Sequence, residues 1–356
     1  MPKNLTRRVQ VGALPIGGGA PVSVQTMLNT KTTDLAACAA QAEAARMAGC
    51  DILRVAVPDE EAARALAGLV KTVSLPVVAD IHFDHRLALL AVDAGVAKLR
   101  INPGNIGGAE RVRAVAQAAM GAKIPIRIGV NGGSLARHLL KKFGGPTPQA
   151  MVESGLEHAR LLQENGFEDI VISLKSSSVL RTVEAYQLMS QTCDFPLHIG
   201  VTEAGTLQTG LVASAAGLGI LLSQEIGDTL RISLCADPVE EVRAGVALLR
   251  HLGLRPPGAR VIACPTCGRC RVDVQKWAVE VETALQQVQV PITVAVMGCA
   301  VNGPGEAREA DVGLAGGDGK ALLFCHGETV GSVDEKDAVK ALLALVDEAL
   351  QRKAGG

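Results

Sequence analysis

The chain has 356 residues, a formal net charge of −1 at pH 7, 48% hydrophobic residues and only 2% aromatic residues. The apolar content is enough for a sizeable core, so a disordered chain is excluded, and the length suggests two domains or one large α/β barrel. Scarce aromatic rings and a near-zero charge argue against binding to single-stranded nucleic acid, DNA or anionic membranes, so any anionic ligand must bind a local cluster of Lys and Arg.

The N-terminal segment does not resemble a signal peptide, because Pro15 and Gly17–Gly19 interrupt it and no apolar core follows. The longest uncharged run lies between Glu203 and Glu225, and its apolar part is Leu211–Leu222. This part is too short for a membrane span and contains Gly and Ser, so it predicts a buried helix. We therefore expect a cytoplasmic protein that does not bind membranes.

The first part of the chain alternates between short β-rich runs and longer helical patterns. Strands are predicted at Pro21–Met27, Asp51–Val57, Pro76–His82, Ala97–Asn102, Pro125–Asn131, Asp169–Lys175, Pro196–Thr202 and Asp228–Leu234. Helical segments between them include Leu35–Ala48, Glu60–Val73, Pro148–Asn165 and Pro238–Leu252. Eight such strand–helix units predict an α/β fold, a closed (β/α)₈ TIM-type barrel rather than an open doubly wound sheet.

The segment Arg–Pro–Pro–Gly at 255–258 predicts a linker between a barrel domain, residues 1–254, and a small α+β domain, residues 259–356. The second domain has a different rhythm of elements. We expect strands at Arg260–Ala263, Ile292–Met297, Leu322–Cys325 and Thr329–Val333, and helices at Val274–Val288 and Lys336–Arg352.

Cationic side chains recur in the predicted barrel strands: Arg54, Arg100, Arg127, Lys175 and Arg231. Because side chains alternate between the two faces of a strand, several of them should point into the barrel mouth, where barrel active sites lie. Each could instead pair with a carboxylate or point outward, but unpaired buried charge is too costly to recur. We therefore expect a small polyanionic substrate whose phosphoryl groups are held by guanidinium groups.

Other polar side chains occupy comparable positions near the strand ends. We expect Asn102, Asn131, His198 and Ser233 to bind substrate beside the cations. The Gly-rich loop 103–108 precedes a helix and could offer backbone N–H groups to a phosphate, although such loops are usually only turns.

Proton transfer in the same mouth has four candidates: Asp80, His82, His198 and Glu203. Each histidine could equally make only an orienting hydrogen bond. Glu203 follows a strand directly and is the best candidate for a general acid. We therefore assign Glu203, Asp80 and His82 to catalysis.

The chain contains nine cysteines. Five are scattered and are expected to be small buried hydrophobic residues: Cys38, Cys50, Cys193, Cys235 and Cys325. The other four are clustered: Cys264, Cys267, Cys270 and Cys299. Clustered thiols in a chain without a secretory signal indicate metal or redox chemistry. Their spacing suits a structural zinc ion or an iron–sulfur cluster and does not decide between them.

The clustered cysteines lie in two longer motifs, Cys–Pro–Thr–Cys at 264–267 and Gly–Cys–Ala–Val–Asn–Gly–Pro–Gly–Glu at 298–306. Further distinctive segments run through the barrel: Val–Gln–Thr–Met (24–27), Val–Ala–Asp–Ile–His–Phe–Asp (78–84), Leu–Arg–Ile–Asn–Pro–Gly–Asn–Ile–Gly (99–107), Pro–Ile–Arg–Ile–Gly–Val–Asn (125–131), His–Ile–Gly–Val–Thr–Glu–Ala–Gly (198–205) and Gly–Asp–Thr–Leu–Arg–Ile–Ser–Leu (227–234). Over nearly the whole chain, these motifs resemble the 4-hydroxy-3-methylbut-2-enyl diphosphate synthase family in its short two-domain bacterial form.

The resemblance implies one [4Fe–4S] cluster per chain, held by Cys264, Cys267, Cys299 and Glu306. It implies that 2-C-methyl-D-erythritol 2,4-cyclodiphosphate is opened and reduced to 4-hydroxy-3-methylbut-2-enyl diphosphate and water, in the non-mevalonate isoprenoid pathway. Reduced flavodoxin or ferredoxin would supply the electrons. The resemblance also implies a head-to-tail homodimer, in which the cluster domain of one subunit closes the barrel mouth of the other.

One residue departs from the family pattern, because Cys270 stands where the family usually has another residue type. An all-thiolate site would then be conceivable, but we expect Cys270 not to be a ligand, since three thiols on one short turn need not all point inward. Two other function classes remain as alternatives. One is a phosphate-binding barrel synthase of the pterin-dependent type with a structural zinc domain, and the other is a zinc-ribbon binding module without catalysis.

Overall fold

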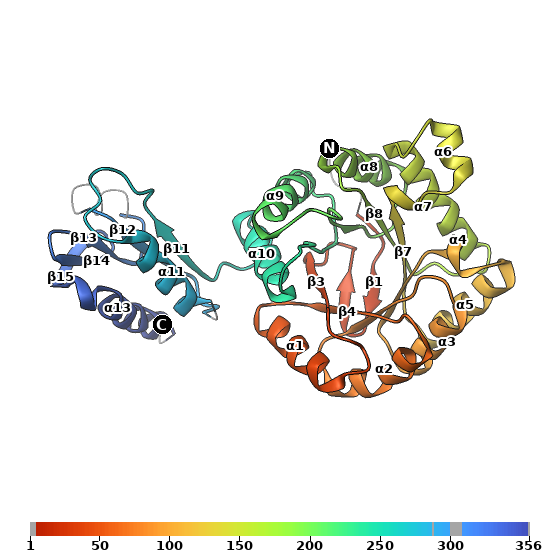
Figure 1. Ribbon diagram of the computed structural model, residues 1–356, viewed down its shortest axis with the longest axis horizontal. Coiled ribbons are helices and arrows are strands. Elements are labelled where there is room, and N and C mark those ends of the chain that lie inside the picture. Colours follow the sequence, from red (N-terminus) through yellow and green to blue (C-terminus); the bar gives the residue numbers. More distant parts are fainter. Residues whose placement is uncertain (1–4, 287, 300–307, 355–356) are drawn as a thin grey trace. The chain divides into compact units, whose positions relative to one another are not determined.

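The computed structural model describes residues 5–286, 288–299 and 308–354. The chain forms two compact units, Met1–Arg255 and Pro256–Gly356 (Figure 1). Each unit has its own hydrophobic core, and each is described by itself below.

The first unit is a closed barrel of parallel strands, which confirms the predicted fold class. Its strands are β3 (Ser23–Met27), β4 (Ile52–Ala56), β5 (Val77–Asp80), β6 (Lys98–Ile101), β7 (Ile126–Asn131), β8 (Ile170–Lys175), β9 (His198–Ile199) and β10 (Thr229–Leu230). They form one sheet in the order β8-β7-β6-β5-β4-β3-β10-β9. A parallel bridge between Ile172 and Leu197 joins β8 to the segment before β9 and so closes the circle.

Helices surround these strands, as Figure 1 shows. They are α1 (Leu35–Met47), α2 (Glu60–Thr72), α3 (His85–Asp93), α4 (Pro103–Ile106), α5 (Ala109–Ala122), α6 (Arg137–Phe143), α7 (Pro148–Gln163), α8 (Val179–Thr192), α9 (Leu207–Ser223) and α10 (Pro238–His251). Several begin at a side-chain cap, because the first N–H groups of a helix lack intrahelical partners. The Asp59 carboxylate accepts from the Ala62 N–H, and the Thr147 hydroxyl accepts from the Ala150 N–H.

A hairpin that the sequence analysis did not predict covers the amino ends of the barrel strands. Its strands β1 (Val9–Val11) and β2 (Leu14–Ile16) pair in antiparallel. Their apolar residues pack against Ile52, Val78 and Val171. These three residues lie at or near the start of β4, β5 and β8, so the hairpin closes the floor of the barrel and leaves its carboxyl end open.

The prediction that Leu211–Leu222 is a buried helix is wrong for one face of α9. Leu218 and Leu221 are fully buried, but Val212 is 69% exposed and Ile220 is 38% exposed. An outer barrel helix has only one face against the sheet, so its apolar composition does not bury the other face. Within the described residues, no helix is long and apolar enough to cross a membrane.

The second unit is a mixed sheet covered by two long helices. Its elements are β11 (Ala259–Ala263), α11 (Val274–Leu285), β12 (Ile292–Met297), β13 (Val312–Gly316), β14 (Lys320–Cys325), β15 (Glu328–Asp334) and α13 (Ala338–Ala354). The strands follow chain order, with parallel pairing from β11 to β13 and antiparallel pairing from β13 to β15. Trp277 and Val281 of α11 pack in one core with Leu342 and Val346 of α13.

Candidate functional site

The strand register decides which side chains face the inside of the barrel. Asp80 of β5 is paired with Arg100 of β6, which in turn is paired with Arg127 of β7. Residues paired in register point to the same face, and the alternate residues, such as Leu99 and Ile126, pack in the core beneath the helices. The interior face therefore carries polar side chains: Gln25, Arg54, Asp80, Lys98, Arg100, Arg127, Lys175, His198 and Arg231.

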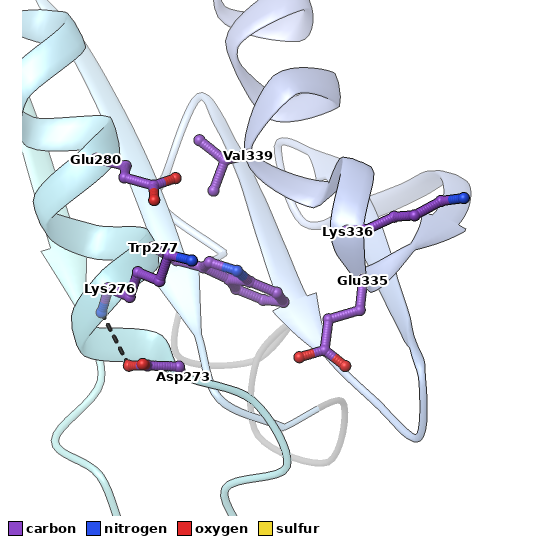
Figure 2. Close-up of a pocket in the computed structure, with 7 residues that line it drawn as sticks. All are labelled: Asp273, Lys276, Trp277, Glu280, Glu335, Lys336 and Val339. Atoms are coloured by element: carbon purple, nitrogen blue, oxygen red, sulfur yellow. Dashed lines mark hydrogen bonds between the residues drawn. The ribbon is translucent and has the colours of Figure 1, made fainter.

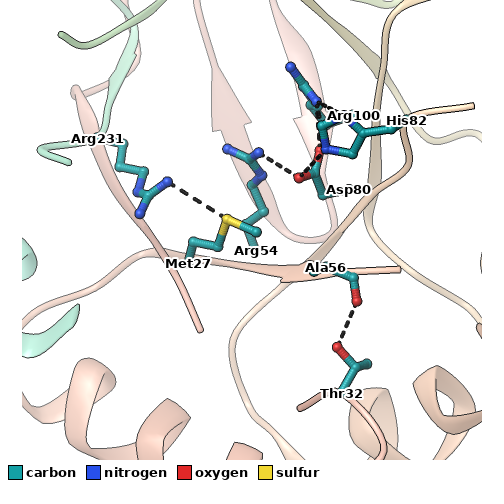
Figure 3. A network of polar contacts seen from close by, with 8 residues as sticks. All are labelled: Met27, Thr32, Arg54, Ala56, Asp80, His82, Arg100 and Arg231. Carbon is teal, nitrogen blue, oxygen red and sulfur yellow. Dashed lines mark hydrogen bonds and ion pairs between the residues drawn. The ribbon is translucent and has the colours of Figure 1, made fainter. Parts of the chain in front are cut away.

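A carboxylate organises two of the cations at the mouth (Figure 3). Asp80 accepts from Nη2 of Arg54 at 2.6 Å and from Nη1 of Arg100 at 3.0 Å, and Nε2 of His82 lies 3.2 Å from Asp80. Burial alone would raise the pKa of Asp80, but Arg54, His82 and Arg100 outweigh it and hold this pKa well below its usual range. Burial lowers the pKa of Arg54 to about 10 despite the attraction of Asp80. Asp80 is thus a permanent anion that orients two guanidinium groups.

Two cations lie deeper in the barrel without such an anion. Lys98 is fully buried and Arg127 is 1% exposed. Among the described residues, Nζ of Lys98 and the Nε and Nη1 atoms of Arg127 have no hydrogen-bond partner. Burial lowers the pKa of both groups, reinforced for Lys98 by repulsion from Arg127 and for Arg127 by repulsion from Arg54 and Arg100. Such donors indicate an anionic ligand, because an unpaired buried charge is strongly destabilising.

The Arg231 guanidinium is fixed by Glu241 of the outer helix α10, to which it donates two hydrogen bonds. Nε and Nη2 of Arg231 each lie 3.1 Å from a carboxylate oxygen of Glu241. The same carboxylate accepts from the Thr26 hydroxyl at 3.0 Å and from the Leu234 N–H at 2.9 Å. Glu241 is 3% exposed and therefore fixes Arg231 firmly beside the strand end.

Two further residues predicted to bind substrate, Lys175 at the end of β8 and His198 at the start of β9, are buried. Burial, with repulsion from Arg127, lowers the pKa of both Lys175 and His198 well below their usual ranges. Nδ1 of His198 lies 3.4 Å from the Thr229 hydroxyl, and Nε2 has no partner within the described structure. His198 is therefore a neutral side chain enclosed by cations, which suits hydrogen bonding to a ligand better than proton storage.

A cavity of about 400 Å³ opens at the carboxyl ends of β7 and β8. Asn131, Ser176, Arg181 and Glu203 are among the residues that line it. Glu203 is exposed and takes a left-handed backbone conformation with φ of 53°. The structure therefore brings the predicted acid beside Asn131, in the loop region where barrel enzymes carry out their chemistry.

The remaining predicted barrel residues contribute less to this geometry. Asn102 is half-buried, and its side-chain oxygen accepts from the Gly104 N–H at 3.1 Å. That bond already uses one N–H of the Gly-rich loop, so the phosphate-binding role of this loop stays a prediction. Ser233 is half-buried beyond β10, and its role is likewise a prediction.

The clustered cysteines lie at one edge of the second sheet. Cys264 follows β11 directly and Cys299 follows β12, and these two strands are parallel neighbours. The Gly298 N–H donates to the Cys264 sulfur at 3.2 Å. Cys267 is exposed, and hydrogen bonds from the backbone and side chain of Arg269 lower its pKa. Adjacent parallel strands thus deliver thiols from two distant motifs to the same edge.

The Cys270 thiol has a partner of its own, since it donates to the Val272 carbonyl at 3.0 Å. A Cβ atom added at Gly298 would lie 2.6 Å from the Cys270 sulfur and 3.4 Å from the Cys264 sulfur. Glycine at position 298 thus leaves room for the Cys270 sulfur, whereas the contact with the Cys264 sulfur would be an ordinary one. Glu306 lies outside the described residues, within which no three His, Cys, Asp or Glu side chains form a metal-binding group.

The scattered cysteines follow the prediction only in part. Cys38 and Cys50 are buried, and Cys193 and Cys325 are half-buried, but Cys235 is exposed. The prediction of burial is wrong for Cys235 because this residue lies beyond the short strand β10, in the loop region at the barrel mouth. There the helices no longer cover the chain.

A second cavity, of about 480 Å³, lies on the second unit beside the only tryptophan (Figure 2). Trp277 is bordered by Lys276 and Glu280 of α11 and by Glu335 and Lys336 ahead of α13. Its charges are mixed, and none of the predicted ligands lines it. We assign it no part in the chemistry.

Three positions with evident roles were absent from the sequence-based site: Lys98, Glu241 and Gly298. Lys98 could have been found, because it lies two residues before Arg100 and therefore shares its strand face. Glu241 lies on a helix among other acidic residues, so only the tertiary structure reveals its contact with Arg231. The importance of Gly298 follows from sulfur positions that a sequence does not give.

Comparison with known proteins gives matches along both units. A family model described as the GcpE TIM-barrel domain matches residues 6–246, and one described as the GcpE protein C-terminal domain matches residues 260–348. A Geobacter sulfurreducens protein described as 4-hydroxy-3-methylbut-2-en-1-yl diphosphate synthase (flavodoxin) is 54% identical over 351 residues, which cover 99% of each chain. A Desulfotalea psychrophila protein of the same description is 54% identical over 346 residues, covering 96% of this chain and 95% of that relative.

A matching solved structure is much more distant than these relatives. A dihydropteroate synthase from Xanthomonas albilineans shares 16% identity with a TM-score of 0.49, covering 70% of this chain and 98% of that one. A likeness at this level carries no argument about function.

Proposed function

The chain belongs to the GcpE family, and on that premise we propose that its barrel binds 2-C-methyl-D-erythritol 2,4-cyclodiphosphate and that its second unit delivers the electrons that reduce it. The protein is an iron–sulfur oxidoreductase, a 4-hydroxy-3-methylbut-2-enyl diphosphate synthase of isoprenoid biosynthesis. The reaction opens the cyclic diphosphate and removes one oxygen as water in a two-electron reduction.

The excess of buried cations inside the barrel is the observation that best supports this substrate. Within the described residues, six basic side chains line the interior, where Asp80 supplies a carboxylate and Glu241 of α10 reaches one of them from outside the strands: Arg54, Lys98, Arg100, Arg127, Lys175 and Arg231. Two carboxylates cannot neutralise six cations, and a diphosphate supplies the missing negative charge. Guanidinium groups also match the geometry of phosphate oxygens.

We assign substrate binding to two sets of residues. Arg54, Arg100, Arg127, Lys175 and Arg231 hold the phosphoryl oxygens, and Asn102, Asn131, His198 and Ser233 bind beside them. Asp80 and Glu241 keep Arg100 and Arg231 in place through the bonds given above. The binding energy of the diphosphate thus fixes the carbon skeleton at the carboxyl end of the strands.

We assign proton delivery to Glu203, which lines the cavity at the strand ends. A carboxylic acid there can protonate the departing hydroxyl so that it leaves as water. Asp80 is committed to two guanidinium groups, so its part in catalysis is to organise charge and to orient His82.

The cysteine edge of the second unit fits an iron–sulfur cluster in its donor set, since neighbouring parallel strands bring Cys264 and Cys299 to the same end of the sheet and the Gly298 N–H donates to the Cys264 sulfur. We propose that Cys264, Cys267, Cys299 and Glu306 hold one [4Fe–4S] cluster per chain. A bound cluster would supply electrons one at a time and an iron with affinity for oxygen ligands. Cys270, whose thiol already donates to Val272, is not assigned as a ligand.

The proposed iron–sulfur chemistry also implies an electron donor and a reducing compartment. The relatives are named for flavodoxin, and we propose reduced flavodoxin, or a ferredoxin, as the electron donor. We further propose a head-to-tail homodimer, which would shield the reacting substrate from water. Thiolate ligands need a reducing compartment, so we place the enzyme in the cytoplasm.

Anaerobic turnover tests the proposed function. Holoenzyme mixed with the cyclodiphosphate and chemically reduced flavodoxin is expected to form 4-hydroxy-3-methylbut-2-enyl diphosphate, detected by phosphorus NMR. The Cys299→Ser variant is the control and is expected to form none. A holoenzyme that binds the cyclodiphosphate but does not consume it with any reduced donor would contradict the proposal.

A further inference from the structure

An inward-facing glycine interrupts the polar lining of β7. Gly129 is paired with Ser173 and lies between the inward-facing residues Arg127 and Asn131. It does not take a left-handed conformation, so its backbone does not require glycine. Glycine inside a strand weakens the strand and often marks a place where another group approaches the backbone closely.

The group that approaches Gly129 is the guanidinium of Arg100. A Cβ atom added at position 129 would lie 2.6 Å from Nη2 and 2.9 Å from Cζ of Arg100. Strand β6 lies between β5 and β7, so Arg100 reaches both neighbours. Its Nη1 donates to Asp80 on one side, and the rest of its guanidinium lies against Gly129 on the other.

A similar arrangement recurs at the neighbouring strands β8 and β9. A Cβ atom added at Gly200, which follows β9, would lie 2.7 Å from Nζ of Lys175. It would also lie 2.6 Å from the Arg231 carbonyl oxygen, so glycine at position 200 is needed for backbone packing as well. At position 129 a substitution would test the effect on a cationic side chain alone. There the three nearest atoms all belong to the Arg100 side chain, and none belongs to the backbone.

We propose that Gly129 is a positioning residue for anion binding, whose missing side chain is the space in which the Arg100 guanidinium lies. The inference rests on the proposed function, in which Arg100 binds a phosphoryl group. Arg100 donates to the protein only from Nη1 in the described structure, which leaves Nε and Nη2 for the ligand. Any side chain at 129 would push this donor pair away from its place.

Gly129→Ala tests the proposal, with Gly121→Ala as the matched control. Gly121 lies in α5 with open space around its Cα, so alanine there touches nothing. We expect Gly129→Ala to fold and to keep its iron content, while its affinity for inorganic pyrophosphate and for the cyclodiphosphate falls roughly tenfold or more, as for a lost charge-assisted bond. KM should rise more than kcat falls. Affinities equal to those of the wild type would overturn the proposal.

A double-mutant cycle with Arg100→Met shows whether Gly129 acts through Arg100. Adding Gly129→Ala to Arg100→Met should cause no further loss of affinity, whereas an additive loss would mean that Gly129 acts in another way.

A crystal structure of Gly129→Ala separates this inference from the proposed function. If even the wild type binds neither anion, the proposed function fails, but the guanidinium of Arg100 should still be displaced in the variant. An Arg100 guanidinium left in its original place would overturn the positioning role.

Discussion

Arg127 is a buried cation of the barrel interior whose guanidinium is only partly satisfied by the protein. It is 1% exposed, and Nε and Nη1 have no partner within the described structure. A merely structural residue would not be kept in this state, because methionine of similar length would fill the space without the cost of a buried charge. Binding and stability should therefore respond in opposite directions when this charge is removed.

Arg127→Met is expected to weaken binding of the cyclodiphosphate by roughly ten- to a hundredfold, the equivalent of about 1.5–3 kcal/mol for charge-assisted bonds. Its thermal stability should stay the same or rise, and its iron content should not change. Arg100→Met, which loses a bond to Asp80, should weaken binding similarly without the gain in stability. Calorimetry and thermal unfolding measure both, and unchanged affinity in both variants would remove the argument from buried cations.

Asp80 gives a prediction that depends on pH. Its folded pKa lies below the unfolded value of about 3.9, so its contribution to stability is present above that value and is lost as the pH falls below it. Asp80→Asn should therefore lower the free energy of unfolding of the barrel by about 3–5 kcal/mol at pH 7, and by less below pH ~4.

The chain has one tyrosine and one tryptophan, whose fluorescence can report the unfolding of each unit. Tyr186 is buried in the barrel unit and Trp277 in the second unit, so their fluorescence follows the two transitions separately. The Trp277 transition serves as the internal control and should not move. A difference between Asp80→Asn and the wild type that stays constant from pH 7 to pH 3 would contradict the ionised Asp80.

Side-chain alternation explains why many inward-facing positions of the barrel were predictable from the sequence. The spacing of two residues from Lys98 to Arg100 and of four from Arg127 to Asn131 follows the period of a strand, and the register shows that each pair shares one face. Contacts between elements carry no such period. Glu241 binding to Arg231, and Gly129 making room for Arg100, depend on which helix or strand lies alongside, so the sequence did not reveal them.

At the scale of elements, the pairing of β11 with β12 builds the cysteine edge. Ala263 is paired with Val296, so the loops that carry Cys264 and Cys299 leave the sheet at the same end. Gly298 joins the two loops, since its N–H donates to the Cys264 sulfur and its carbonyl accepts from the Arg271 N–H at 3.1 Å. A side chain at 298 would separate the loops.

Gly298→Ala is therefore expected to lose most of its bound iron, because the added Cβ would meet the Cys270 sulfur at 2.6 Å and Val274 at 2.8 Å. Cys270→Ser is the matched variant and should retain near-normal iron, since the Cys270 thiol donates to a backbone carbonyl. Iron and sulfide analysis of anaerobic protein measures both. Loss of iron in Cys270→Ser would instead make Cys270 a ligand.

The elements differ in how well the sequence predicts them. The central strands β4 to β8 were found because parallel strands buried on both faces form clear apolar runs. The predicted strands Pro196–Thr202 and Asp228–Leu234 shrink to β9 and β10, since their later residues turn into the loops at the mouth. The β1–β2 hairpin was missed because its strands are only three residues long, with Pro15 in the second, and β13 was missed because its glycines resemble a turn.

At the scale of the whole molecule, the barrel cations proposed to bind substrate and the clustered cysteines lie in different compact units. Under the proposed head-to-tail homodimer, each complete site combines the barrel of one chain with the cluster unit of the other. A defect in one unit should then be complemented by a chain with a defect in the other unit.

Mixing Glu203→Gln with Cys299→Ser tests this arrangement. Each variant alone should be inactive or nearly so, with turnover of Glu203→Gln lowered by roughly 10²–10⁴, as expected when a general acid is lost. Heterodimers should recover activity, because one of their two sites receives an intact barrel and an intact cluster unit. Demonstrated subunit exchange without recovery would mean that each chain completes its own site.

The central claim, a redox enzyme with an iron–sulfur cluster rather than a barrel with a structural zinc domain, is tested most directly by metal analysis of anaerobically purified protein. We predict a brown protein with broad absorption in the blue part of the visible spectrum, about four iron and four sulfide per chain, and bleaching on reduction. A colourless protein that contains stoichiometric zinc and no sulfide would contradict the account.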